Sequence, residues 1–119
     1  MSYSDAVLDH FEHPRNVGEL ADADAEVRLE HPVCGDIMKL AVKLADGRIG
    51  QVRFRTRGCV AAIAAGSCLT ELIAGKSVTE AAALRREQLL EALGGLPEAS
   101  THATQLAMDA LQQVLSKIG

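Results

Sequence analysis

Residues 37–56, IMKLAVKLADGRIGQVRFRT, constrain the possible fold more than any other stretch of the chain. Apolar residues stand at alternate positions from Met38 to Leu44, which is the two-residue period of a strand with one buried face. The dipeptide Asp46-Gly47 is typical of two-residue hairpin turns, and apolar residues return after it. We therefore expect two antiparallel strands joined by a tight turn at this dipeptide.

The segments on either side of the hairpin indicate the rest of the architecture. From Glu26 the chain alternates again, as EVRLE, and Pro32 ends this first strand or places it at an edge. After Cys59 the period changes, and the run VAAIAAGSCLTELIAG predicts a buried helix of small residues that ends at Gly75 as its C-cap. The predicted fold class is α+β: a three-stranded antiparallel sheet with helices packed on one face.

Shorter helices are expected from their capping residues. Ser4 is a plausible N-cap for a first helix with an apolar stripe of Val7, Leu8 and Phe11. The sequence SVTE from Ser77 is a capping-box pattern, so another helix should begin there. The remaining expected segments are a loop at 16–24, a short helix at 86–93 and a final amphipathic helix at about 100–117.

Composition narrows the class of protein. With 119 residues we expect one domain, and 3% aromatic residues mean that its core must be aliphatic. The net charge of −4 argues against a nucleic-acid partner, and the basic cluster of Arg53, Arg55 and Arg57 reads as the solvent face of a strand or a patch for an acidic partner. No apolar run has the length of a membrane span, and the N-terminus does not resemble a signal peptide. The three cysteines form no disulfide framework. We therefore expect a cytoplasmic protein without a membrane partner.

Two short motifs contain the candidate site. Cys34-Gly35-Asp36 lies in the turn between the first two predicted strands, and Gly58-Cys59 lies between the third strand and the small-residue helix. In a meander these two connections are at the same end of the sheet. The glycines allow unusual backbone angles and close approach beside the reactive side chains. Topology alone therefore brings the two motifs together.

Two thiols and a carboxylate in one place form a mixed soft and hard set of metal ligands. Cys59 also stands at a helix N-terminus, which favours the thiolate. The alternative is that Cys34 and Cys59 are simply buried thiols. His102, near the start of the last helix, is a fourth candidate ligand, and its alternative role is a solvated helix residue.

Other residues of the same types have simpler interpretations. Cys68 follows Cys59 by nine residues, which places it on the opposite side of a continuous helix, so we expect a buried small hydrophobe. His10 and His13 flank the first helix, where surface or capping roles are expected. His31 precedes a proline and is expected at the edge of a strand.

Several segments resemble the IscU/NifU-type iron–sulfur cluster assembly scaffolds along nearly the whole chain. The stretches YSDAVLDHFEHPRNVG, CGDIMKL, RTRGCVAAIAAGS, TELIAGKS and LPEASTHATQLAMDAL look like successive motifs of that family. The resemblance implies that residues 1–119 are a single NifU-like N-terminal scaffold domain. Such a scaffold collects iron and sulfide, builds a [2Fe–2S] cluster and passes it to apo acceptor proteins, and is not an enzyme in the turnover sense.

Carried over by position, Cys34, Asp36, Cys59 and His102 match the family's ligand set, and zinc is a possible metal when no cluster is present. Two departures stand out. The family's third cysteine, a ligand implicated in accepting sulfur from a cysteine desulfurase, is replaced by Ala103. The recognition motif for an Hsp70-type chaperone and its J-type partner is degraded at Leu96–Ser100.

These departures leave three hypotheses. The first is a scaffold or carrier for [2Fe–2S] clusters, with sulfur arriving on Cys34 or Cys59. The second is a zinc protein of the same fold that transfers sulfur together with a cysteine desulfurase. The third is a degenerate relative that binds no metal and acts only by occupying the desulfurase. The chain lacks the insertion of the zinc-binding SufU subgroup, so it is closer to the IscU type.

Overall fold

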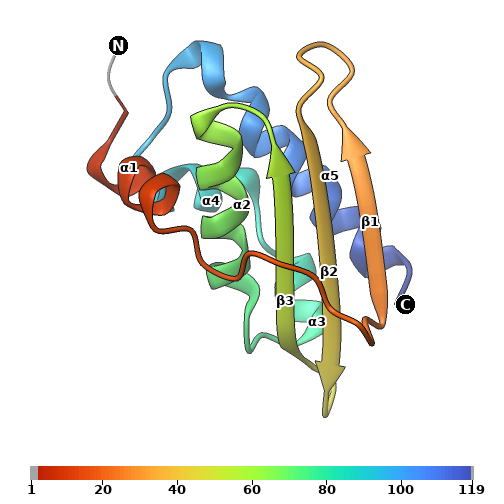
Figure 1. Cartoon of the computed structure of the whole chain (residues 1–119). Helices are drawn as coiled ribbons and strands as arrows, with labels where there is room; N and C mark the ends of the chain where they lie inside the picture. The colour runs from red at the N-terminus through yellow and green to blue at the C-terminus, as the bar shows by residue number, and fades with distance from the viewer. Residues whose placement is uncertain (1–2, 119) are drawn as a thin grey trace.

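A computed structural model describes residues 3–118 and shows a three-stranded antiparallel sheet in the order β1-β2-β3 with helices on one face (Figure 1). The predicted α+β class is confirmed. The elements in chain order are α1 (Asp5–Glu12), β1 (Ala25–Glu30), β2 (Ile37–Ala45), β3 (Arg48–Arg57), α2 (Val60–Ile73), α3 (Val78–Ala82), α4 (Arg86–Ala92), a 3₁₀ turn (Glu98–Ser100) and α5 (His102–Ser116).

The hairpin forms where the alternating pattern predicts it. Asp46 and Gly47 both have positive φ, 54° and 75°, which is the conformation that a tight two-residue hairpin turn requires. Register is continuous from the turn except for an irregularity between Lys43 and Leu44. The side chains of Met38 and Leu40 are fully buried in the apolar core, and Met38 lies against α2 near Gly66.

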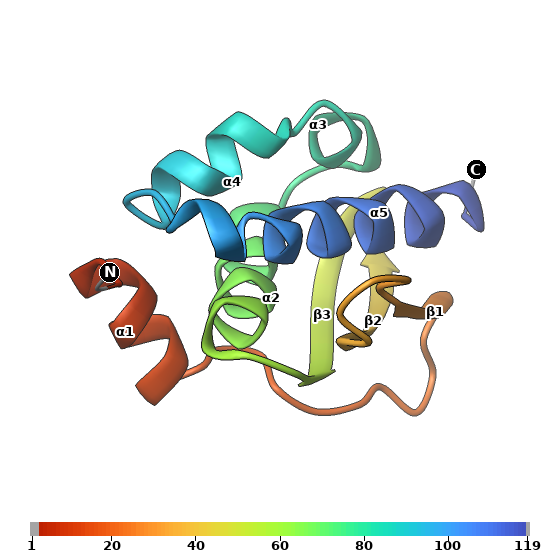
Figure 2. The same cartoon turned by 90° about the horizontal axis from the view of Figure 1, so that it is seen from above.

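Helices α2 and α5 cover the inner face of the sheet, and α3 and α4 form an outer layer beyond them (Figure 2). Helix α2 packs closely because its residues are small. A Cβ on Gly66 would lie 2.5 Å from ring atoms of Phe54, so only glycine lets the helix rest on that ring. Gly75 has the expected left-handed φ of 79°, but the helix is capped one residue earlier, at Ala74.

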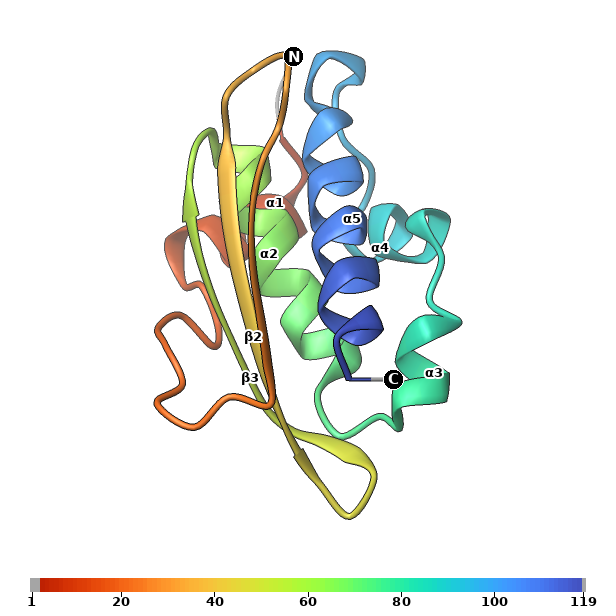
Figure 3. The ribbon, with the colours of Figure 1, turned by 90° about the vertical axis from the view of Figure 1, so that its right-hand side faces the viewer.

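The opposite face of the sheet is crossed by the segment between α1 and β1 (Figure 3). This segment is irregular, as expected for residues 16–24, but Val17 also makes a parallel bridge to Phe54. Glu19 forms ion pairs with Lys39 and Arg55, which fastens the segment to the sheet. The outer face is therefore partly covered: Arg55 and Arg57 are exposed, as expected for a solvent face, whereas Arg53 is half-buried and donates to Asn16.

The expected apolar stripe of α1 is only partly correct. Ser4 caps the helix by accepting from the Val7 amide, and Val7 is fully buried, as predicted. Leu8 and Phe11, however, are 40% and 37% exposed. The buried face of α1 consists instead of Val7 and His10, which are three residues apart and therefore lie on the same side of the helix.

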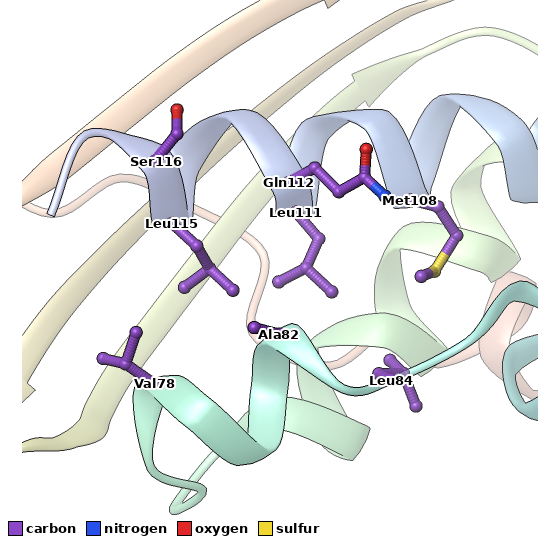
Figure 4. A pocket seen from close by; sticks show the side chains of 8 residues that line it. All are labelled: Val78, Ala82, Leu84, Met108, Leu111, Gln112, Leu115 and Ser116. Atoms are coloured by element: carbon purple, nitrogen blue, oxygen red, sulfur yellow. The ribbon is translucent and has the colours of Figure 1, made fainter. Parts of the chain in front are cut away.

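An apolar groove of 310 Å³ lies between α3 and the later turns of α5 (Figure 4). Its apolar lining residues are Val78, Ala82, Leu84, Met108, Leu111 and Leu115. His102 is the first residue of α5, whereas this groove begins at Met108, so the groove is separate from the end of the helix that faces the candidate site.

No helix within residues 3–118 combines the length and the apolar character that crossing a bilayer demands.

Candidate metal centre

Three connections meet at one end of the sheet, as the predicted topology requires (Figure 1). They are the loop from β1 to β2, the junction of β3 with α2, and the start of α5. Ile37, the first residue of β2, pairs with Glu30 on one side and Arg57 on the other. This register places Asp36 directly beside Gly58.

Asp36 is at the centre of the cluster. Its Oδ2 lies 3.4 Å from Cys59 Sγ and 3.4 Å from His102 Nε2. Cys59 Sγ is in turn 3.8 Å from His102 Nε2. A thiol, a carboxylate and an imidazole from three separate parts of the chain thus form one set of mutual contacts.

Cys34 completes the group from the exposed side. Ligand atoms of Cys34, Asp36 and His102 all lie within 4.8 Å of one another. Cys34 is exposed, whereas Cys59 is half-buried. All four residues that the sequence singles out therefore converge, with one thiol facing solvent and the other packed against the start of α2.

The two glycines of the motifs have different structural roles. Gly35 has φ of 77° and supplies the left-handed turn between Cys34 and Asp36. Gly58 leaves room, because a Cβ there would lie 2.5 Å from Asp36 Cγ. Gly35 confirms the expected unusual backbone angle, and Gly58 confirms the expected close approach.

Asp36 is ionised more easily than an ordinary aspartate. Burial disfavours its charged form, and this is the largest single effect on its pKa. Hydrogen bonds from the side chain and backbone of Cys59, together with the hydrogen bond and charge of His102, outweigh that burial and lower the pKa. A carboxylate in this position is a hard, anionic ligand for a cation.

The expectation that the start of α2 favours a Cys59 thiolate is wrong for the metal-free protein. Burial raises the pKa of Cys59, and the Asp36 carboxylate raises it further, while the backbone amides of Ala62 and Ala61 only partly compensate. The helix N-terminus acts as predicted, but desolvation and a neighbouring negative charge are stronger. A bound cation must therefore displace a proton from this thiol.

Position 103, where the resemblance leads one to expect a third cysteine, faces the core. Ala103 is fully buried and belongs to the main apolar cluster. The adjacent His102 points the other way, toward Asp36 and Cys59. The four converging donors are thus two thiols, one carboxylate and one imidazole, a set that could hold one tetrahedral metal or the iron atoms of a small cluster.

The interpretation of Cys68 as a buried small hydrophobe is confirmed. It is 3% exposed in the middle of α2, and burial raises the pKa of its thiol to about 11. His13 caps the end of α1, as expected.

His10 is not a surface residue, which corrects the sequence-based expectation. Its Nδ1 lies 2.7 Å from the hydroxyl of Ser67 on α2, and its Nε2 lies 3.5 Å from Glu71. Burial and then the charge of Arg15 lower the pKa of His10, against the opposing effect of Glu71. His10 therefore joins α1 to α2 and is not part of the metal centre. Its spacing from Val7 was the available signal of burial.

Sequence reasoning also missed the position of His31. It follows the last residue of β1, as an edge position predicts, but its ring turns toward the cluster. The ring centroids of His31 and His102 are 5.4 Å apart in an edge-to-face arrangement. His31 Nδ1 accepts hydrogen bonds from the backbone amides of Val33 and Cys34. No motif of the sequence signals these contacts.

The chain is similar to known proteins in both sequence and fold. Two iron–sulfur cluster assembly scaffold proteins are similar in sequence. IscU 1 of Archaeoglobus fulgidus is 48% identical over 113 residues, which cover 95% of this chain and 74% of the relative. IscU of Escherichia coli K12 is 42% identical over 120 residues, which cover 98% of this chain and 93% of the relative. The crystal structure of a nitrogen-fixing NifU-like protein (N-terminal) from Brucella abortus shares the fold, with a TM-score of 0.77 at 20% identity over 97% of this chain and 92% of that one.

Residues 2–118 match the NifU-like N terminal domain family. Because this match spans nearly the whole chain and the IscU proteins align over the same length, the protein is a member of the NifU-like N-terminal domain family.

Proposed function

We propose that this chain is a scaffold for the assembly and transfer of iron–sulfur clusters, with Cys34, Asp36, Cys59 and His102 holding a [2Fe–2S] cluster as cargo. The observation that carries the proposal is the convergence of these four donors at one end of the sheet. The relatives that are 42–48% identical are named as cluster assembly scaffold proteins, not as enzymes, which supports the same role.

The donor set suits cargo that must be released. Thiolates bind iron strongly in iron–sulfur proteins, whereas carboxylate and imidazole are harder ligands. With two thiols and not three or four, the cluster is held less firmly. Cys34 and the neighbouring Val33, which is 88% exposed, place one side of the centre at the surface. An apo acceptor protein can approach from that side.

Sulfur reaches the centre through Cys34 in this proposal. The cysteine desulfurase carries the incoming sulfur as a persulfide, and the Cys34 thiolate attacks its terminal sulfur. The S–S bond of the desulfurase breaks as a new S–S bond forms on Cys34, and the desulfurase cysteine leaves as a thiolate. Release of sulfide then requires two electrons from an external reductant. Cys34 is favoured over Cys59 because it is exposed.

The chaperone partner remains a prediction. Residues 96–100, where the motif is degraded, lead directly into His102 and include the 3₁₀ turn Glu98–Ser100. Glu98 and Ala99 are exposed. A chaperone that bound here would act on the segment that positions the imidazole of the centre. The thiols of Cys34, Cys59 and Cys68 are free, which suits the cytoplasmic location that we expect.

A second candidate is a zinc-binding sulfur-transfer protein. Two cysteines, one aspartate and one histidine are also donor types that suit four-coordinate zinc, and the exposed Cys34 could then carry sulfur. Metal content separates the two candidates, because a zinc protein contains no acid-labile sulfide. The third candidate, a metal-free desulfurase regulator, predicts that neither is present.

Anaerobic reconstitution tests the proposal. Apo protein is incubated with ferrous iron, a cysteine desulfurase, cysteine and a thiol reductant, and the visible absorption spectrum is recorded. We expect sulfide-to-iron charge-transfer bands in the parent protein and their loss in Cys59→Ser. Cys68→Ala is the matched control, since it removes a thiol outside the centre and should keep the bands. A parent protein without these bands contradicts the proposal.

A further inference from the structure

The family resemblance accounts for four residues of the candidate centre, and a fifth residue lies beside them. The fifth is His31, at the start of the loop that contains Cys34. It is half-buried, and its ring lies edge-to-face against His102 with centroids 5.4 Å apart and planes at 63°. It therefore contacts one proposed ligand, His102, and belongs to the same loop as two others, Cys34 and Asp36.

The loop folds back on His31 through four hydrogen bonds. The Val33 and Cys34 amides donate to His31 Nδ1 at 3.2 and 3.4 Å. The Gly35 amide donates to the His31 carbonyl at 2.9 Å, and the His31 amide donates to the Asp36 carbonyl at 2.8 Å. Every residue from 33 to 36 is thus tied to His31, so this residue sets the path of the loop that carries both Cys34 and Asp36.

These hydrogen bonds also determine whether His31 can act as a metal ligand. Since backbone amides only donate, Nδ1 must offer its lone pair to them, and the proton of the neutral ring is then on Nε2. Neither ring nitrogen has a free lone pair for a metal while the loop is intact. His31 therefore does not replace the missing third thiol as a ligand.

We propose that His31 is a positioning residue of the metal centre, which orders the Cys34 loop through Nδ1 and packs against the ring of His102. His102 makes its contacts with Asp36 and Cys59 through Nε2, so its ring must hold one orientation to serve as a ligand. An edge-to-face neighbour restricts rotation of that ring. This inference rests on the proposed function only for the identity of the metal ions that Cys34 and Asp36 of this loop would bind.

Two variants separate positioning from ligation. His31→Ala removes the acceptor, whereas His31→Asn keeps a side-chain oxygen that can accept from the same amides, as asparagine does in turns. His13→Ala removes an exposed histidine outside the centre and is the matched control. Cobalt(II) serves as the metal probe, because its spectrum reports thiolate ligands through charge-transfer intensity.

Two measurements follow on the full chain. Amide hydrogen exchange of the apo protein should be about fivefold faster at residues 33 and 34 in His31→Ala, as expected for the loss of an ordinary hydrogen bond, and near the parent rate in His31→Asn. Cobalt(II) titration should show affinity about tenfold lower or more in His31→Ala, with the parent spectrum at saturation and with affinity largely restored in His31→Asn.

The two measurements can contradict the two proposals independently. Unchanged exchange at residues 33 and 34 in His31→Ala overturns the positioning role whatever the metal result. An altered charge-transfer or d–d spectrum that both variants share would identify His31 as a ligand and also overturn it. Absence of thiolate-to-cobalt bands in the parent protein would instead contradict the proposed function, and the exchange rates would still decide the role of His31 in the loop.

Discussion

Gly58→Ala tests the geometry of the centre most sharply, because it adds one carbon atom against a proposed ligand. The new Cβ would lie 2.5 Å from Asp36 Cγ, 2.8 Å from Oδ1 and 2.9 Å from Oδ2. Non-bonded carbon atoms rest at about 3.5–4.0 Å, so the carboxylate must retreat by about 1 Å or more. Asp36 Oδ2 now lies 3.4 Å from both Cys59 Sγ and His102 Nε2, and both contacts would be lost.

Gly58→Ala should weaken metal binding and leave the stability of the fold nearly unchanged. We expect about 10–100-fold lower zinc affinity in Gly58→Ala, the range seen when a ligand loses its supporting contacts. The free energy of unfolding should change by less than about 1 kcal/mol, because Gly58 is exposed and Asp36 can turn outward. Competition with a chromogenic zinc chelator gives the affinity, and urea denaturation gives the stability.

Gly50→Ala is the matched control, since it crowds the side chain of Ala45 at the far end of the sheet, with a Cβ at 2.9 Å. It should leave zinc affinity unchanged. Gly58→Ala should also have no further effect when Asp36 is already alanine, because the two changes act through one contact. If Gly58→Ala binds zinc like the parent, or weakens binding equally in both backgrounds, the reasoning about Asp36 is refuted.

Three further predictions concern the support around the centre. The pKa of His10 is lower in the folded protein than in the unfolded chain, so the unfolded state takes up a proton first as the pH falls. The free energy of unfolding should therefore decrease as the pH drops below about 6.5. His10→Gln should flatten this dependence between pH 7.5 and 5.5, as urea titrations can measure. In folded apo protein at pH 8, iodoacetamide should label the exposed Cys34 and spare Cys68, whose pKa is about 11, as peptide mass spectrometry can show. Gly66→Ala should lower the free energy of unfolding by about 1–3 kcal/mol in denaturant titrations, because its Cβ would lie 2.5 Å from the ring of Phe54.

Each of these three has a clear contrary result. An unchanged pH slope in His10→Gln would mean that the histidine is not the group that titrates. Rapid labelling of Cys68 in the native state would show that the middle of α2 opens to solvent. A Gly66→Ala protein as stable as the parent would show that α2 can shift away from Phe54 without loss.

Much of the fold was predictable because local patterns and topology agree. The alternation on both sides of Asp46-Gly47 specifies the hairpin, and the small residues after Cys59 specify a helix that can lie close to the sheet. Once the sheet is a meander, the Cys34 and Cys59 connections must share one end. Such arguments need only the order of strands along the chain.

The parts that sequence reasoning missed depend on contacts between distant residues. His10 is buried because Ser67, far away in the sequence, supplies a hydroxyl 2.7 Å from its ring. The pKa of Cys59 is raised because burial and Asp36 outweigh the start of α2. His31 reaches His102 only because the loop folds back on its own imidazole. Only the burial of His10 has a sequence signal, its three-residue spacing from Val7; the Cys59 and His31 effects have none in spacing or composition.

The central claim is that the chain carries iron–sulfur cargo on two thiols, a carboxylate and an imidazole. Iron, zinc and acid-labile sulfide content of the protein, produced together with a cysteine desulfurase and purified anaerobically, tests it most directly. The account predicts iron and sulfide in equal amounts, lost in Cys59→Ser and retained in Cys68→Ala. One zinc per chain without sulfide, or neither metal nor sulfide, would contradict it.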